Sequence, residues 1–296
     1  MIHKTVLLNE SIDGLDIHEG DIYLDGTLGS AGHAKYALEK TNGKLTIIGL
    51  DKDIDALERS KQRLGESSKI ILKESSYEDL DKVLNEIGIK KVNRIMLDLG
   101  LSSDQFETSG RGFTFKNDEP LLMSFKKTLN ESDLSAFQIV NNWQEESIAD
   151  IIYGYGEEKY ARRIAKGIIN YRKKKSIETT GELVEIILQS VPIFYRKGRL
   201  HPATRTFQAL RITVNDELNV LKRGLEIGFE RLEKQGRMAV ISFHSLEDRI
   251  VKIFNKDKFD KGLAKIITKR PIVPTDTEIF ENPRSRSAKL RILEKL

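Results

Sequence analysis

Between residues 22 and 99 the sequence repeats one pattern, in which short apolar runs alternate with segments of helical periodicity. Three of the apolar runs end at an aspartate, namely Asp25, Asp51 and Asp98. Strands that alternate with helices indicate a parallel sheet with helices on both faces. The pattern therefore predicts an α/β fold in which several strands end in acidic side chains.

The alternation stops near residue 105. Residues 106–205 carry helical periodicity without strand signals, most clearly at 147–171 and at 180–191, where Thr179 is a candidate helix cap. This region is expected to form a separate helical domain.

Strand signals return after a long helix that is expected from residue 209 to about residue 234. Apolar runs follow at 237–243, 265–268 and 290–293. We therefore predict a sheet domain made of residues 1–105 and 209–296, with the helical domain inserted at 106–208.

The composition narrows the class of protein. The chain has 296 residues and 39% hydrophobic content, enough for two domains with sizeable cores. It contains no cysteine, which excludes disulfides and zinc-thiolate sites, and we expect no metal. We expect no signal peptide, because no long apolar run follows the N-terminal residues, and no apolar run in the sequence is long enough to span a membrane. These features fit a cytoplasmic protein.

Glycines at 26, 29 and 32 follow the first of these aspartates and precede a helix. Such a turn lets the backbone approach a ligand closely and leaves helix N–H groups free. A dinucleotide would require the Gly-x-Gly-x-x-Gly spacing, which is absent. An acidic residue before a looser turn favours S-adenosylmethionine, whose amino-acid part carries an ammonium group.

Two further positions extend this candidate cofactor site. Asp51 ends the next strand, where a carboxylate can accept hydrogen bonds from both ribose hydroxyls; capping of the following helix is the alternative. Tyr77 follows the third strand and suits stacking on adenine, although a core tyrosine is equally consistent with the sequence.

Across nearly its whole length the chain resembles the bacterial small-subunit ribosomal RNA cytosine-N4 methyltransferases of the RsmH/MraW type. The resemblance rests on an ordered set of motifs: His3 with residues 6–8 and Glu10, Asp25-Gly26-Thr27-Leu28-Gly29 with Gly32-His33, and residues 49–53, 97–103, 111–115, 155–158, 201–211, 214–218, 241–249 and 282–289. Each motif alone is weak, whereas the set in this order is very specific.

The resemblance implies a class I (Rossmann-like) S-adenosylmethionine-dependent methyltransferase core with an inserted helical domain, residues 106–208, that recognises the substrate. It implies methyl transfer to N4 of one cytosine of 16S ribosomal RNA, near the decoding centre, with the small ribosomal subunit RNA as partner. The implied cofactor contacts are Ala31, Gly32, His33, Asp51, Tyr77 (usually Phe in the family), Asp98 and Gln105. The residues alone had already pointed to Gly32, Asp51, Tyr77 and Asp98.

The chain departs from the family pattern in two places. The usual turn Gly-Arg-Gly-Gly-His-Ser is replaced by residues 29–34, where Ser30 and Ala31 stand in place of the arginine and a glycine. The usual Pro-Leu-Asp-Met-Arg-Met is replaced by residues 120–125, so that Leu122 and Ser124 stand where the family has a carboxylate and an arginine.

Catalysis should depend mainly on positioning the cytosine amine in line with the methyl group, at a distance of about 3–3.5 Å. A hydrogen-bond acceptor on the amine would assist, and we assign this role to Asp98, Ser102 or Ser103, or to a nearby carbonyl. His244 is a candidate proton acceptor because it follows a strand end. Alternatively, His244 and Asp248 hold the strand-to-helix turn together.

RNA contact is expected from cations and aromatic residues. Residues 160–175 contain no acid and many cations, although such a run can also be a solvated face. Arginine pairs with phosphate and stacks on bases, and Phe113 and Phe115 could stack on a flipped cytosine or belong to the core. The candidate RNA-binding residues are Phe113, Phe115, Arg162, Arg163, Lys166, Arg172, Arg205, Arg211, Arg284 and Arg286.

Two other functions remain open from the sequence. One is a methyltransferase that acts on another nucleic acid, a protein or a small molecule. The other is a ribosome assembly factor that binds the cofactor without transferring methyl. A nicotinamide-dependent dehydrogenase is disfavoured by the glycine spacing. The sequence also leaves open whether the chain forms a homodimer.

Overall fold

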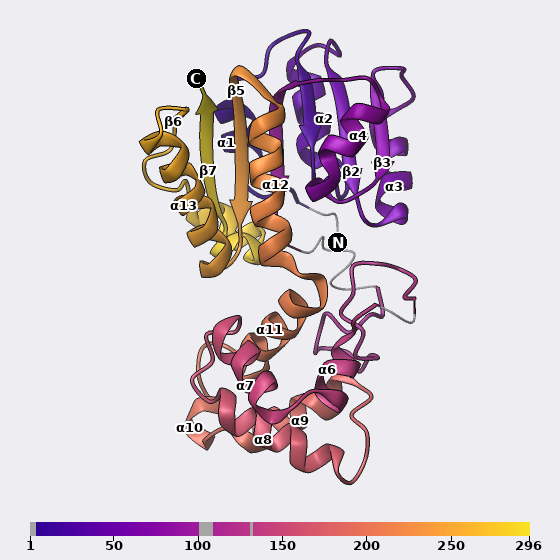
Figure 1. The fold of residues 1–296 in the computed structure, drawn as a ribbon, viewed down its shortest axis with the longest axis vertical. Helices are drawn as coiled ribbons and strands as arrows, with labels where there is room; N and C mark the ends of the chain where they lie inside the picture. The colour runs from indigo at the N-terminus through magenta and orange to yellow at the C-terminus, as the bar shows by residue number, and fades with distance from the viewer. Residues whose placement is uncertain (1–3, 101–108, 131–132) are drawn as a thin grey trace. The chain divides into compact units, whose positions relative to one another are not determined.

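The computed structural model describes residues 4–100, 109–130 and 133–296. The chain divides into two compact units (Figure 1). One, the sheet unit, comprises Met1–Gly100 and Leu218–Leu296, and the other, the helical unit, comprises Leu101–Glu217. Among the described residues, no helix is both long enough and apolar enough to cross a membrane.

The sheet unit contains a seven-stranded sheet with the order β3-β2-β1-β4-β5-β7-β6. The first five strands are parallel, and β7 pairs antiparallel with both β5 and β6. This is a mixed α/β, Rossmann-like sheet, as predicted from the sequence. The strands are β1 Ile22–Asp25, β2 Thr46–Asp51, β3 Ile70–Glu74, β4 Val92–Asp98, β5 Leu232–Ser242, β6 Ala264–Ile266 and β7 Lys289–Lys295.

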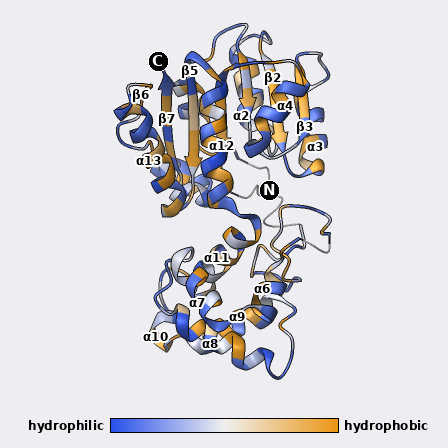
Figure 2. Ribbon diagram, viewed as in Figure 1, coloured by the Kyte–Doolittle hydropathy of each residue, from blue (hydrophilic) through white to orange (hydrophobic). Residues whose placement is uncertain are grey.

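Helices cover both faces of this sheet. Alternate strand residues point to opposite faces, so Leu24 and Ile95 pack on one side while Tyr23 and Met96 pack on the other. The first face packs against α4 (Leu80–Glu86), α12 (Glu217–Arg231) and α13 (Ser245–Asp260). The second packs against α1 (Leu8–Leu15), α2 (Gly32–Lys40) and α3 (Ile54–Leu64). Because both faces are buried, the strands are predominantly hydrophobic (Figure 2).

The long helix expected at 209–234 is instead two helices. The first, α11, spans Ala203–Asn215, and the second is α12. Asp216 separates them with a left-handed backbone (φ 50°), which interrupts the helical hydrogen bonds. Strand β5 also begins earlier than expected, at Leu232, and contains Gln235 with φ 60° beside a register irregularity against β4.

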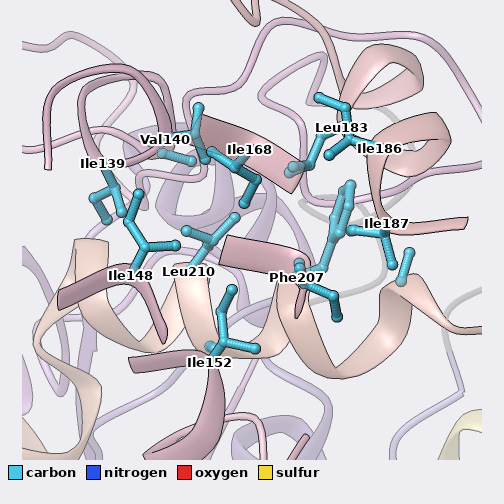
Figure 3. Packing of buried hydrophobic residues seen from close by; sticks show 14 of the residues in the cluster. Ile139, Val140, Ile148, Ile152, Ile168, Leu183, Ile186, Ile187, Phe207 and Leu210 are labelled. Atoms are coloured by element: carbon cyan, nitrogen blue, oxygen red, sulfur yellow. The ribbon is translucent and has the colours of Figure 1, made fainter. Parts of the chain in front are cut away.

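The helical unit packs around an aliphatic core in which Ile152, Ile168 and Leu210 are fully buried (Figure 3). The stretch expected to be helical at 147–171 is two helices separated by a turn at residues 155–160. Thr179 caps α9 as expected, in a reciprocal capping box with Glu182. Besides α11, the helices here are α6 Ala136–Asn142, α7 Glu145–Gly154, α8 Ala161–Arg172, α9 Thr180–Ser190 and α10 Ile193–Arg196.

Candidate active site

The strand order reverses between β1 and β4, because β2 and β3 lie on one side of β1 while β5, β7 and β6 lie beyond β4. Ligands of open α/β sheets bind at the carboxyl ends of the strands at such a switch point. Asp25 ends β1 and Asp98 ends β4. The first and third of the acidic strand ends are therefore brought together where a ligand is expected.

Asp25 is almost fully buried beneath the turn that follows β1. Its Oδ1 accepts the Thr27 N–H at 3.2 Å, and its Oδ2 accepts the Tyr23 hydroxyl at 3.2 Å. Burial is the main cause that raises the pKa of Asp25 to about 7, and the nearby charge of Asp51 adds to it. A second ionised carboxylate beside Asp25 therefore costs free energy, unless a cation neutralises the pair or one of the two carboxyls is protonated.

Asp98 is held by its backbone, since its N–H donates to Oγ1 of Thr27 at 2.6 Å. Its Oδ1 is buried without a hydrogen-bond partner, and Oδ2 lies 3.9 Å from Nδ1 of His33. Nε2 of His33 lies 3.1 Å from the Val6 carbonyl oxygen. Burial, followed by the charges of Asp25 and Glu247, raises the pKa of Asp98 well above its usual range.

Asp51 joins the second strand end to the glycine turn. Its Oδ2 accepts the Gly29 N–H at 2.8 Å, and its Oδ1 accepts the Asp53 N–H at 2.9 Å. Asp53, rather than Asp51, caps α3 by accepting the Asp55 N–H. Asp51 is therefore not the cap of this helix, which was the alternative role that the sequence left open. Burial raises the pKa of Asp51.

The turn itself has a specific backbone requirement. Gly29 has φ 53° and Ala31 has φ 56°, so the position where the family usually has glycine is left-handed here with an alanine. Gly32 starts α2, and a Cβ built there would lie 1.8 Å from Oγ1 of Thr5. The left-handed backbone at residues 29 and 31 and the close approach of Thr5 to Gly32 explain why these positions hold glycine or alanine.

Tyr77 begins the short 3₁₀ helix Tyr77–Asp79 after β3 and is partly buried. A Cβ on Gly224 of α12 would lie 2.3 Å from Cδ2 of Tyr77, so the ring packs directly on that glycine. A Cβ on Gly26 would also come within 2.8 Å of Cβ of Tyr77. The tyrosine thus lies beside the glycine turn, and its packing is consistent with both roles that the sequence left open.

These side chains suit S-adenosylmethionine in sign and in hydrogen-bonding capacity. The cluster is acidic, with Asp25 buried and Asp51 and Asp98 partly buried, and none of the three carboxyls forms an ion pair with a lysine or arginine in the part of the chain that the structure describes. The unpartnered Oδ1 of Asp98 is a free acceptor in this cluster. A ligand with a positive charge and hydroxyl donors would satisfy both features.

His244 is the N-cap of α13. Its Nδ1 accepts the Glu247 N–H at 3.4 Å, and the Glu247 carboxylate accepts the N–H groups of Phe243 and His244. Nε2 of His244 is buried 3.1 Å from Oε1 of Glu247 without a hydrogen bond. This arrangement fits the structural alternative for His244, but the partner is Glu247, because Asp248 pairs with Lys289 and Arg291.

Three candidate residues, Ser102, Ser103 and Gln105, lie outside the described residues, as does His3 of the motif set.

Several candidate RNA-binding residues of the helical unit have internal partners. Phe113 is 5% exposed and stacks on Phe125, as expected for a core residue. Phe115 is partly buried and stacks on His201 with ring centroids 4.7 Å apart. Three arginines also have partners: Arg172 with the Val140 carbonyl, Arg205 with the Glu157 carbonyl and Arg211 with Glu217.

The remaining cations extend into solvent. Arg162, Arg163 and Lys166 are exposed on α8, and the guanidinium of Arg163 lies 5.8 Å from the ring centroid of Tyr160. In the sheet unit, Arg284 and Arg286 are exposed in the 3₁₀ helix Pro283–Ser287. The structure thus separates the predicted cations into an exposed group and a group used in packing.

The departure at residues 120–125 lies in a segment held by its backbone. Arg111 donates from Nη1 to the Phe125 carbonyl, and Asn215 accepts the Phe125 N–H while donating to the Met123 carbonyl. Ser124 is buried and accepts the Lys126 N–H. The contacts of Arg111 and Asn215 use main-chain atoms of Met123 and Phe125, so they do not depend on the side chains at 122 and 124.

Sequence reasoning passed over three residues of this cluster. Asp25 was recognised as an acidic strand end but was not among the expected ligands, and Tyr23 and Thr27 were not considered. The available signal was the pair Gly26-Thr27 that follows β1. The Thr27 N–H donates to Oδ1 of Asp25, and its Oγ1 accepts the N–H of Asp98 at the end of the neighbouring strand β4.

The sequence is similar to those of known proteins over its whole length. A family model described as the MraW methylase family matches residues 1–296. The chain is 44% identical to a ribosomal RNA small subunit methyltransferase H of Clostridium botulinum, with 99% of each chain covered. It is 48% identical to the protein of that name from Sulfurihydrogenibium sp., with 98% of each covered.

Among solved structures, an rRNA methylase from Streptococcus thermophilus is similar over 100% of this chain and 99% of its own, with 13% identity and a TM-score of 0.47. The family model and the curated relatives, which extend over essentially the whole sequence, establish the relationship. The chain belongs to the MraW methylase family.

Proposed function

We propose that this protein transfers a methyl group from S-adenosylmethionine to the exocyclic N4 of one cytosine in 16S ribosomal RNA. Family membership across residues 1–296 is the observation that carries the proposal. The acidic cluster at the carboxyl ends of β1, β2 and β4 supports it, because a cationic cofactor would neutralise these buried carboxyls. The substrate is ribosomal RNA, so we place the reaction in the cytoplasm, on the small ribosomal subunit.

Bound S-adenosylmethionine supplies a methyl group on a positively charged sulfur. We assign to Asp51 the ribose hydroxyls, because both of its oxygens are already oriented by backbone N–H groups. Ala31, Gly32 and His33 of the turn would hold the amino-acid part, and Tyr77, which lies beside Gly26 of this turn, would stack on the adenine. Gln105 remains a cofactor contact implied by the resemblance.

We assign to Asp98 the role of orienting the cytosine amine, because it ends β4 at the switch point of the sheet and its side chain is 23% exposed. An acceptor on one amine hydrogen lets the nitrogen pyramidalise, so that its lone pair becomes available. The N–C bond forms as the S–C bond breaks, and the amine then loses one proton. Ser102 and Ser103 are the other candidate acceptors, and His244 is a candidate for receiving the proton.

The test is methyl transfer from labelled S-adenosylmethionine to purified small subunits, followed by mass spectrometry of the nucleosides. N4-methylcytidine is the expected product, and Asp98→Asn should lower the rate by at least about 100-fold. Glu74→Gln is a matched control, because Glu74 also ends a strand but is exposed. Cofactor binding without any label on the RNA would instead favour the assembly-factor alternative.

The same assay tests His244. If its role is to cap α13, His244→Asn should retain turnover and stability, since asparagine also accepts a helix N–H. A proton-accepting role predicts that turnover falls in His244→Asn while stability stays unchanged.

A further inference from the structure

The segment from Ile193 to Leu200 in the helical unit exposes an unusual amount of apolar surface. Ile193 and Phe194 of α10 are each 69% exposed, and Leu200 is 51% exposed. Of the large hydrophobic side chains in the described part of this unit, only Tyr153 and Phe137 are also in the exposed class. Exposed apolar groups gathered in one place mark an interaction surface.

The same segment is strongly basic. Arg196, Lys197 and Arg199 are exposed, and none of them forms an ion pair with a described residue. The sequence contains no acidic residue between Glu185 and Asp216. The apolar side chains are thus flanked by cations that no described acidic residue neutralises.

Aromatic contacts connect this segment to the start of α8. The rings of Tyr160 and Tyr195 meet edge to face with centroids 4.9 Å apart, and Nζ of Lys159 lies 5.1 Å and 5.2 Å from the two centroids. The Tyr195 hydroxyl donates to the fully buried Glu158 at 2.6 Å, which holds α10 in place. Arg163 of α8 lies beside the Tyr160 ring, which in turn contacts Tyr195 of α10.

We propose that α10, the turn to Leu200 and the start of α8 form a binding surface for a single-stranded segment of ribosomal RNA, in which Phe194 stacks on an unpaired base. The proposal rests on the proposed function. Single-stranded RNA is bound through base stacking on aromatic side chains and through phosphate contacts with cations, and this surface presents both. The uncompensated positive charge favours a polyanion over a second copy of this basic chain.

The stacking contact is tested with Phe194→Ala and Phe194→Trp. Binding to purified small subunits, measured by filter retention at fixed salt, should weaken about tenfold or more in Phe194→Ala and be retained in Phe194→Trp. Tyr153→Ala removes an aromatic side chain that is 70% exposed in the same unit and should bind as wild type. Equal binding by Phe194→Ala and wild type would overturn the stacking role.

The phosphate contacts are tested with the triple variant R196Q/K197Q/R199Q. The slope of log affinity against log salt should decrease by about 2, since each phosphate contact to a single strand contributes about 0.7. The control K252Q/K269Q/R270Q removes three exposed cations of the sheet unit and should lower the slope less. An unchanged slope in the first variant would overturn the proposal.

Protein-free 16S RNA identifies the occupant. The proposal predicts that the Phe194→Ala defect persists with naked RNA. A defect confined to assembled subunits would assign the surface to a ribosomal protein, and a change in sedimentation of the free enzyme would assign it to a second copy; either result overturns the proposal. Wild-type methyl transfer and S-adenosylhomocysteine binding are measured in parallel, so that failure of the proposed function is recognised separately.

Discussion

The two units place their charged groups in opposite ways. In the sheet unit, three carboxyls are drawn into the protein at the ends of neighbouring strands, where burial raises their pKa values. In the helical unit the core is mainly aliphatic, and many cations, such as Arg162 and Arg196, extend into solvent. A small cationic ligand requires a dry and preorganised site, whereas a long polyanion requires an accessible surface. The difference suggests that cofactor and RNA recognition can be altered independently.

The largest effect is expected at Asp51. Asp51→Ala should weaken cofactor binding by at least about 100-fold, because hydrogen bonds to a charged group contribute about 1.5–3 kcal/mol each and two would be lost. Calorimetric titration with S-adenosylhomocysteine measures this, with the exposed strand-end variant Glu74→Ala as control. If the comparison holds, RNA affinity should change little; a parallel loss of RNA binding would show that the two recognitions are coupled.

The next effect concerns the core of the helical unit. Leu210→Ala should lower its free energy of unfolding by about 2–5 kcal/mol, because a fully buried side chain leaves a cavity. Trp143, the one tryptophan of the chain, packs against this core and reports its unfolding in urea by fluorescence. Leu225→Ala is the matched variant in the sheet unit.

For Leu210→Ala, we expect cofactor affinity to stay within about twofold of wild type in the absence of urea. Weakened cofactor binding in this variant would contradict the independence of the two units.

The third effect is a dependence of cofactor affinity on pH, which is expected from the sheet unit. Asp25 in the cofactor-free protein has a pKa of about 7, and a cationic ligand favours its ionised form. Binding of S-adenosylmethionine should therefore release a proton from Asp25. The affinity for this cofactor should rise about tenfold, or about 1.4 kcal/mol, from pH 6 to pH 8. Asp25→Asn should flatten this dependence. An unchanged pH profile in Asp25→Asn would assign the titration to another group, such as Asp98.

The same pKa shift of Asp25 acts on the stability of the fold in the opposite direction, because stability falls as the pH rises. Because folding raises the pKa of Asp25 from 3.8 to about 7, the folded protein binds this proton more tightly than the unfolded chain. The stabilising contribution is present below pH 4 and is lost as the pH rises through 7. Melting temperatures of the cofactor-free protein should follow this trend more steeply in wild type than in Asp25→Asn.

The smallest effect is expected at the left-handed turn of the sheet unit. Ala31→Gly should change stability by less than about 1 kcal/mol, because relief of the positive φ offsets the loss of a buried methyl group. Ala34→Gly, within α2, has no such relief and should be destabilising by about 1–2 kcal/mol. Equal losses in the two variants by thermal melting would contradict strain at residue 31.

Local patterns predicted the sheet well. The apolar runs at 22–24, 45–50 and 92–99 correspond to β1, β2 and β4, because a strand buried on both faces is recognisable from its composition alone. The helix expected at 209–234 was wrong, since the break at Asp216 and the early start of β5 at Leu232 involve polar residues with no periodic signal.

The site was predicted in part. The acidic strand ends identified the cofactor region, because parallel strands bring their carboxyl ends to one edge. The environment of each residue was not predictable: the sequence does not tell that Arg211 is paired with Glu217 while Arg162 is exposed. The α10 surface was also missed, because exposure of Phe194 depends on tertiary packing.

The position of β7 between β5 and β6 has a consequence for biosynthesis. Strand β6, at Ala264–Ile266, pairs only with β7 among the described strands, so it has no partner until Lys289–Lys295 has been synthesised. The helical unit, in contrast, is one continuous stretch of chain, Leu101–Glu217. During translation we therefore expect the helical unit to fold first, while the β1–β4 half of the sheet waits for its completing strands.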